Sequence, residues 1–292
     1  MSENPITDEM IEAYRRDGFV IARTLLPSSD LQRLTERLEA IVDGRIPPAD
    51  GMVVMKDVMV AKGAVQPKSR LEAIAKIQFY ENDPVLDSYT THPRILDCVE
   101  RFIGHDVQSI HTMLINKPPN VQGHHPLHQD LLYFPFRPAD KIVASWTALE
   151  PVNRENGCLV AVPGSHTGEL LSHGDPEGLE WLNGGYWGVL DLGDAKEKRV
   201  HLEMEPGDTV FFHPILLHGS GRNRTQGFRR AMSAHYCAVD VEWVWKTGEI
   251  FGDRKFRIVR GERAGSLWAG KRGGGEVDPG DFLDLGLPNT DP

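Results

Sequence analysis

The stretch HHPLHQDL, at residues 124–131, decides how this chain is interpreted. Side chains two apart in an extended strand point to the same face, so His128 and Asp130 would place an imidazole beside a carboxylate. With one distant histidine, that pair would form a 2-His-1-carboxylate triad, which binds ferrous iron and leaves three coordination positions open. A His-x-Asp pattern also arises in surface loops where the Asp caps a helix. The surrounding sequence therefore has to decide between the two interpretations.

A second stretch, EPGDTVFFHPILLHGSG at residues 205–221, offers the distant histidine. Its Pro-Gly pair fits the central positions of a type II turn, and residues 209–212 then form a buried strand. His213 and His218 compete for the role of third ligand. His213 precedes a proline and would cap a strand end, whereas His218 stands before a Gly-Ser-Gly bend, where the mouth of a barrel would lie. We therefore expect His218 to be the ligand.

Arg229 follows His218 by eleven residues, on a strand that returns from the bend. A guanidinium group matches a carboxylate with two parallel hydrogen bonds, so an arginine here suits the capture of an acidic ligand. The alternative is an ordinary surface arginine. The position of Arg229 on the returning strand favours the binding role.

These motifs together resemble the phytanoyl-CoA dioxygenase family of Fe(II)- and 2-oxoglutarate-dependent oxygenases. The similarity covers roughly residues 74–237, and its motifs are long and occur in the family's order. They lie at residues 111–119, 125–131, 133–138, 156–160, 207–214, 218–221 and 225–229.

The resemblance implies a role for eight residues. His128, Asp130 and His218 would hold the iron, and Arg229 would hold the distal carboxylate of 2-oxoglutarate. The family positions around that cosubstrate are matched by Lys76, Met113, Trp146 and Ser220.

Four of these assignments have a plainer alternative from the residues alone. Trp146 and Met113 could be core residues, Ser220 could form a turn, and the role of Lys76 rests wholly on the resemblance. His124 and His125 suit the entry of a strand better than a ligand role.

The resemblance also implies the reaction. Dioxygen and 2-oxoglutarate are the cosubstrates, and an unactivated C–H bond is hydroxylated. Related halogenases lack the carboxylate ligand, so Asp130 favours hydroxylation. We expect a branched or fatty acyl-CoA, hydroxylated at C2. The alternatives are another small metabolite, a cupin-like metalloenzyme that uses no oxygen, and a binding module without activity.

Composition restricts the partners. The 292 residues carry a formal net charge of −10, which disfavours nucleic acid and anionic membranes as partners. An anionic acyl-CoA would therefore need a local basic cluster, for which Arg137, Lys141, Arg154, Arg222 and Arg224 are candidates. The three cysteines are isolated, as in a reducing compartment. No apolar run approaches the roughly 18 residues of a membrane span. Without a signal peptide or a terminal Ser-Lys-Leu address, we expect a cytoplasmic protein. The oligomeric state stays open.

The pattern of elements predicts a mainly β fold, a double-stranded β-helix or jelly roll, in one domain over residues 1–292. Helices are expected at 9–16, from a capping box at Ser29 to Gly44, and at 94–103. The core, about residues 106–240, has expected strands at 107–117, 126–136, 142–150, 157–163, 199–204, 209–217 and 228–238. A helical and strand part (1–105) precedes it, and an extension (241–292) follows. We expect an irregular excursion at 45–70 and a lid or binding loop at 166–198.

Overall fold

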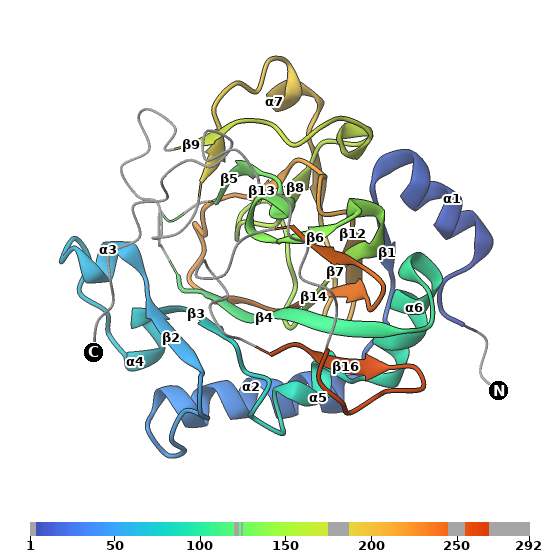
Figure 1. Ribbon diagram of the computed structural model, residues 1–292. Coiled ribbons are helices and arrows are strands. Elements are labelled where there is room, and N and C mark those ends of the chain that lie inside the picture. The colour runs from blue at the N-terminus through green and yellow to red at the C-terminus, as the bar shows by residue number, and fades with distance from the viewer. Residues whose placement is uncertain (1–3, 120–122, 124, 175–186, 245–254, 269–292) are drawn as a thin grey trace.

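The computed structural model describes residues 4–119, 123, 125–174, 187–244 and 255–268 of the chain (Figure 1). Its helices are α1 (Asp8–Asp17), α2 (Ser28–Val42), α3 (Val58–Ala61), α4 (Arg70–Ala73), α5 (Asp87–Thr90), α6 (Pro93–Ile103) and α7 (Ala195–Lys198), with 3-10 turns η1 (Asp130–Tyr133), η2 (Ala139–Lys141) and η3 (Ser165–Thr167). Its strands are β1 (Phe19–Ala22), β2 (Val53–Lys56), β3 (Ile74–Gln78), β4 (Val107–Lys117), β5 (His125–His128), β6 (Phe136–Arg137), β7 (Ile142–Ala148), β8 (Leu159–Ala161), β9 (His173–Gly174), β10 (Gly188–Val189), β11 (Val200–Leu202), β12 (Thr209–Phe212), β13 (His218–Ser220), β14 (Arg229–Ala238), β15 (Glu242–Trp243) and β16 (Arg257–Arg260).

Two antiparallel sheets form the core of the fold. The larger sheet has the order β1-β12-β7-β14-β4-β3-β2, with β16 also paired to β4, and the smaller sheet has the order β11-β8-β13-β5. Apolar side chains of both sheets pack into one cluster between them, including Trp146 of β7, Ala231 of β14 and Ala161 of β8. Figure 1 shows β5, β8 and β13 on one side of β4 and β14, with α2 and α5 on the other. This architecture confirms the predicted double-stranded β-helix.

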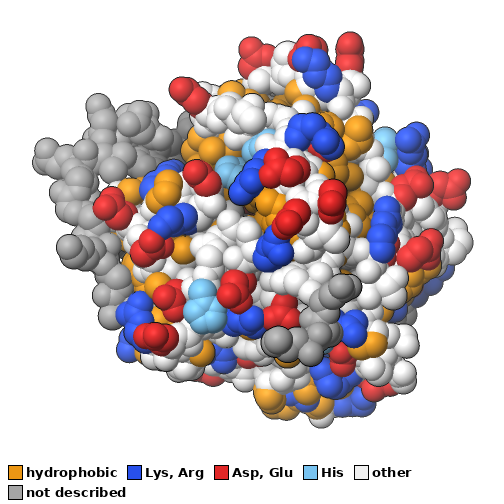
Figure 2. Space-filling model, turned by 90° about the vertical axis from the view of Figure 1, so that its right-hand side faces the viewer, with side chains coloured by type: hydrophobic (Ala, Val, Ile, Leu, Met, Phe, Trp, Pro, Cys, Tyr) orange, Lys and Arg blue, Asp and Glu red, His pale blue; other side chains and the backbone are white. Residues whose placement is uncertain are grey.

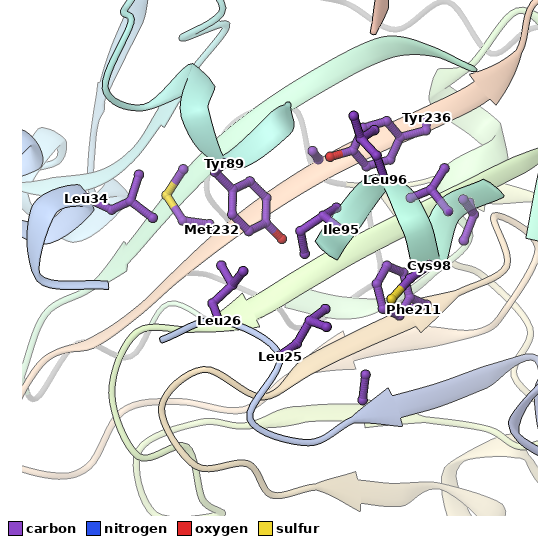
Figure 3. Close-up of a cluster of buried hydrophobic side chains, with 14 of the residues drawn as sticks. Leu25, Leu26, Leu34, Tyr89, Ile95, Leu96, Cys98, Phe211, Met232 and Tyr236 are labelled. Atoms are coloured by element: carbon purple, nitrogen blue, oxygen red, sulfur yellow. The ribbon is translucent and has the colours of Figure 1, made fainter. Parts of the chain in front are cut away.

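The helices cover the outer face of the larger sheet. On β14, alternate side chains from Met232 to Tyr236 point into this outer core, where they meet Leu34 of α2 and Leu96 of α6 (Figure 3). Tyr89 of α5 reaches the same cluster. The period of two along β14 therefore sends one set of side chains under the helices and the other set toward the smaller sheet.

Local signals explain where the helices begin and end. Thr7 accepts a hydrogen bond from the backbone of Met10 at the start of α1, and Gly18 ends that helix with a φ of 83°. Pro93 is the first residue of α6, as expected from the sequence. The predicted capping box at Ser29 is wrong, because α2 begins one residue earlier, after Pro27, and has no side-chain cap.

Several strand predictions need correction. The expected strand at 126–136 stops at His128, since η1 begins at Asp130. The expected strand at 209–217 stops at Phe212, where Pro214 has no N–H to continue the ladder. Residues 218–220 then form β13, where the sequence predicted a bend. As a result, His128 is the last residue of β5 and Asp130 is the first residue of η1.

The expected excursion at 45–70 has more regular structure than predicted. β2 pairs with β3 at the edge of the larger sheet, and the short helices α3 and α4 connect this edge. From the expected loop at 166–198, β9 and β10 pair with each other; residues 175–186 of that loop lie outside the described residues, as does the tail from Gly270.

Figure 2 shows the distribution of charged side chains on one face of the molecule. On the side shown in Figure 2, acidic and basic side chains are interspersed rather than gathered by sign. No helix within the described ranges is long and apolar enough to cross a membrane.

Candidate metal centre and active site

Three buried residues from three elements meet at one point. His128 ends β5, Asp130 begins η1, and His218 begins β13. Their ligand atoms all lie within 4.8 Å of one another. Asp130 Oδ1 is 3.3 Å from His128 Nε2 and 3.6 Å from His218 Nε2. Among the described residues, these three form the one group of histidine and carboxylate side chains placed to hold a metal ion.

The backbone around the cluster explains how the residues meet. Gln129 is extended, with φ −124° and ψ 122°, so His128 and Asp130 project to the same side although the strand has ended. His218 lies directly opposite His128 where β13 pairs with β5. A Cβ on Gly219 would come within 2.6 Å of the His125 carbonyl oxygen, so only glycine permits this approach of the two strands.

Hydrogen bonds fix the tautomer of both histidines. His128 Nδ1 lies 2.8 Å from the carbonyl oxygen of Pro126, and His218 Nδ1 lies 2.9 Å from that of Leu216. A carbonyl oxygen only accepts, so each Nδ1 carries the proton and donates. Each Nε2 therefore has its lone pair available to a metal, as in metal sites where the other ring nitrogen is held by a carbonyl.

Burial and neighbouring side chains shift the pKa values of His218 and Asp130. Burial lowers the pKa of His218 to about 4, so its imidazole is neutral at physiological pH. Burial alone would raise the pKa of Asp130, but its neighbours His218 and His235 hold it well below its usual range. Two neutral imidazoles and a carboxylate are the donor set that suits ferrous iron, so the residues fit the metal.

His213, the competing candidate, lies outside this cluster. Its ring packs 5.4 Å from the ring of His166 and 6.5 Å from that of Tyr14. Its Nδ1 accepts a hydrogen bond from the backbone of Ile215. His213 therefore caps the turn after β12, as one of the two sequence interpretations held.

Arg229 of β14 stands on the inner face of the larger sheet, which packs against the smaller sheet that carries His128 and His218. The side chain is 1% exposed, and its guanidinium carbon lies 5.4 Å from the centre of the Trp146 ring. Ala231, the next inward residue of β14, faces Ala148 across the sheet, so small side chains leave room beside the arginine. A buried arginine on an aromatic face suits a carboxylate ligand.

Trp146 has a second feature relevant to a ligand. Its indole nitrogen is buried and has no hydrogen-bond partner among the described residues. A buried indole N–H usually finds an acceptor. This unmatched donor, close to Arg229, fits an acidic ligand between the two sheets better than it fits a plain core tryptophan.

Lys76 and Met113 line neighbouring strands of the same sheet. Lys76 of β3 lies opposite Ile115, and Met113 of β4 lies opposite Ser233. Burial lowers the pKa of Lys76 to about 7, so an anion beside it would favour its charged form. The two strands thus bring these family positions toward Arg229, which β14 contributes.

Ser220 has two polar neighbours, one of which the sequence did not predict. Lys117 Nζ donates to Ser220 Oγ at 3.0 Å and also to the carbonyl oxygen of Gly221. Because Ser220 Oγ accepts from Lys117, its own hydroxyl proton remains for His125 Nδ1, 3.3 Å away, or for a ligand. Lys117 lies directly across from Arg229, and burial together with this arginine holds the pKa of its amine well below the usual range.

His235 is the second residue that sequence reasoning did not assign to the site. Its Nε2 lies 2.8 Å from Asp130 Oδ2. The available signal was strand parity, because His235 shares the inward face of β14 with Arg229 and Ser233. Parity alone could not show that the loop carrying Asp130 folds back onto this strand.

The proposed basic cluster does not form from all five candidates. Arg137 donates to the carbonyl oxygens of Phe134 and Phe136, Lys141 pairs with Asp240, and Arg154 pairs with Glu203 at 3.7 Å. The remaining two, Arg222 and Arg224, are exposed in the loop after β13. His124 lies outside the described residues.

Comparison with known proteins places this geometry in context. The family model "Phytanoyl-CoA dioxygenase (PhyH)" matches residues 14–231. A probable phytanoyl-CoA dioxygenase of Caenorhabditis elegans is 46% identical over 242 residues, covering 81% of this chain and 77% of the relative. The peroxisomal phytanoyl-CoA dioxygenase of Homo sapiens is 44% identical over 247 residues, covering 84% of this chain and 72% of the relative.

Solved structures show the same fold at lower identity. The apo form of EctD from S. alaskensis has a TM-score of 0.66 and 20% identity, and the match covers 94% of this chain and 90% of that one. The epimerase SnoN from nogalamycin biosynthesis, solved with Fe3+, alpha ketoglutarate and nogalamycin RO, has a TM-score of 0.64 and 22% identity. That match covers 87% of this chain and 98% of SnoN.

Proposed function

The chain belongs to the phytanoyl-CoA dioxygenase family and is an Fe(II)- and 2-oxoglutarate-dependent dioxygenase, and we propose that it hydroxylates an acyl-CoA thioester at C2. The observation that carries the substrate class is the identity of 44–46% to phytanoyl-CoA dioxygenases across more than four-fifths of the chain. The buried His128, Asp130 and His218 cluster supplies the matching ligand set.

In the proposed mechanism, His128 Nε2, His218 Nε2 and one Asp130 oxygen hold the iron. The carbonyl contacts of both Nδ1 atoms leave each Nε2 available to the metal, and the pKa of Asp130 is held well below its usual range, so its carboxyl is ionised. With iron bound, 2-oxoglutarate and dioxygen are converted to succinate and carbon dioxide, and one oxygen atom is inserted into the substrate C–H bond.

The other inward residues bind and orient the cosubstrate. We propose that Arg229 pairs with the distal carboxylate of 2-oxoglutarate, while the Trp146 ring supports the guanidinium. The Ser220 oxygen already accepts a hydrogen bond from Lys117, so its hydroxyl proton is available to the same carboxylate. Lys76 adds a charge and Met113 an apolar wall. The charge-assisted contacts would set which end of the cosubstrate reaches the metal.

The acyl-CoA substrate is an anion, whereas the chain itself carries a net charge of −10, so binding requires local basic side chains. We propose Arg222 and Arg224, which are exposed in the loop after β13, as contacts to the CoA head. A cytoplasmic location and a single domain over residues 1–292 stay predictions; the human relative is named as peroxisomal.

The test compares a branched acyl-CoA with its free acid under air, with ferrous iron and 2-oxoglutarate. Succinate and the 2-hydroxy product are measured together, and Asp130→Ala, which removes a proposed ligand, is the control. We expect the thioester to stimulate succinate formation with matching 2-hydroxy product. Faster turnover of the free acid, or of an unrelated metabolite, would reject the acyl-CoA substrate and leave the oxygenase chemistry in place.

A further inference from the structure

We propose that His235 is a positioning residue that restricts Asp130 to one oxygen as a metal ligand, and so keeps three coordination positions open. The inference rests on the proposed iron site and extends it to a residue outside the ligand set. It follows from the separate surroundings of the two Asp130 oxygens.

The two oxygens of Asp130 face different partners. Oδ1 lies toward the metal-binding nitrogens, 3.3 Å from His128 Nε2 and 3.6 Å from His218 Nε2. Oδ2 lies 2.8 Å from His235 Nε2. A carboxylate oxygen only accepts, so His235 donates through Nε2–H. This charge-assisted hydrogen bond holds Oδ2 away from the point where the two ligand nitrogens meet.

The rest of the His235 side chain has no competing polar role. His235 is 2% exposed, and its Nδ1 has no hydrogen-bond partner among the described residues. Its ring is packed between aromatic neighbours, with ring centres 4.8 Å away for Phe134, 5.7 Å for His111 and 6.4 Å for Phe212. A histidine kept for structure alone would use both nitrogens. The polar contact of this ring is therefore directed at Asp130.

A β-bulge in the neighbouring strand lies beside His235. Opposite the step from His235 to Tyr236, β4 carries one extra residue, Ile110, so the register between the strands shifts there. Such bulges bend the strand and redirect a side chain, and they are frequent beside active sites. Here the bulge lies beside His235, the side chain of β14 that contacts Asp130 in η1.

The coordination count gives the contact its function. An octahedral ferrous ion bound by two histidines and one carboxylate oxygen has three open positions. The cosubstrate needs two of them and dioxygen needs the third. If both Asp130 oxygens bound the metal, one of these positions would be lost. The His235 hydrogen bond prevents this without contributing a ligand.

The test counts water molecules on a bound metal and does not require turnover. Mn(II) replaces iron, and the number of exchangeable inner-sphere waters is obtained from water-proton relaxation, without 2-oxoglutarate. We expect three waters for the wild type, three for H235Q, whose amide can donate at the same place, and two for H235L. The affinity of the Mn(II)-loaded H235L protein for 2-oxoglutarate should fall by at least about tenfold, the lower end of the range for lost outer partners of metal ligands.

His213→Leu is the matched control, since it also removes a buried histidine, but one whose ring packs beside His166 and Tyr14 and is not in the ligand cluster. It should keep three waters. Three waters and unchanged 2-oxoglutarate affinity in H235L would overturn the role of His235, as would equal losses in H235L and H235Q. If H235L does not fold, the unbranched H235M replaces it against H235Q. A wild type that binds no Mn(II) would instead contradict the iron site itself, so the two failures are distinguishable.

Discussion

The two faces of the larger sheet carry different kinds of residue on the same strands. On the outer face, β14 presents Met232, Ala234 and Tyr236 to the helices, in a continuous apolar core (Figure 3). On the inner face, the same strand presents Arg229, Ser233 and His235 toward the smaller sheet. Both sets are almost fully buried. Burial therefore does not separate core from site here; the unequal chemistry of the two faces does.

This comparison indicates how the stability and the chemistry are divided. A dry outer core gains free energy from every apolar contact, whereas buried cations and imidazoles cost free energy unless a partner or ligand compensates them. We therefore expect outer-face variants to lower stability with little effect on ligands. Inner-face variants should lower metal or cosubstrate binding with less effect on stability.

The largest effect should come from the third metal ligand. His218→Ala removes one of three ligand atoms and should abolish metal binding and turnover, measured by metal content after dialysis and by succinate formation. His213→Ala, a buried histidine outside the cluster, should retain most of the metal. Loss of the metal in the His213 variant and its retention in the His218 variant would reverse the assignment.

A cavity on the outer face should affect stability most. Met232 is fully buried, so Met232→Ala should lower the free energy of unfolding by about 2–5 kcal/mol, measured by urea denaturation. The affinity of the folded protein for 2-oxoglutarate should stay the same. Met113→Ala, on the inner face and only partly buried, is the matched variant and should cost less stability while weakening 2-oxoglutarate binding. If the two variants behave alike, the faces are not functionally distinct.

Adjacent arginines test the same contrast at one step of β14. Arg229→Ala should weaken 2-oxoglutarate binding at least tenfold, about 1.4 kcal/mol, because the distal carboxylate would lose a charge-assisted pair. Iron affinity should hardly change. Arg230 points to the other face and pairs with Glu150 and Glu39, so Arg230→Ala should leave the Michaelis constant for 2-oxoglutarate as it is. An unchanged constant in Arg229→Ala would remove this residue from the site.

The smallest effect concerns pH. Burial lowers the pKa of His213 to about 4, so between about pH 6.5 and 4 the unfolded chain takes up a proton that the folded chain resists. Stability must therefore fall as the pH falls. From pH 7 to 6, this one histidine should contribute a loss of roughly 0.7 kcal/mol for a reference pKa near 6.5. Urea midpoints of the metal-free wild type and His213→Leu should show the difference, and parallel pH profiles would contradict it.

Some features were determined by the sequence itself. The mainly β fold and the bounds of α6 and β4 follow from local patterns: a period of two in the strands, a proline at a helix start, glycine at a helix end. The family follows from the resemblance of long motifs that occur in the family's order. The same patterns identified His128, Asp130 and His218, which the structure brings together. Their role as iron ligands stays a prediction, as do the roles of Arg229, Lys76, Met113, Trp146 and Ser220.

Only the tertiary structure decided which residues support the site. Lys117 reaches Ser220 across a separation of 103 residues, and His235 reaches Asp130 across 105. Strand parity places His235 on the inward face, but no local pattern predicts the partner of either residue, since both contacts depend on how the smaller sheet and η1 lie against the larger sheet. Strand parity fixes which face a side chain uses, but the partner opposite that face is set by the packing of segments distant in the chain.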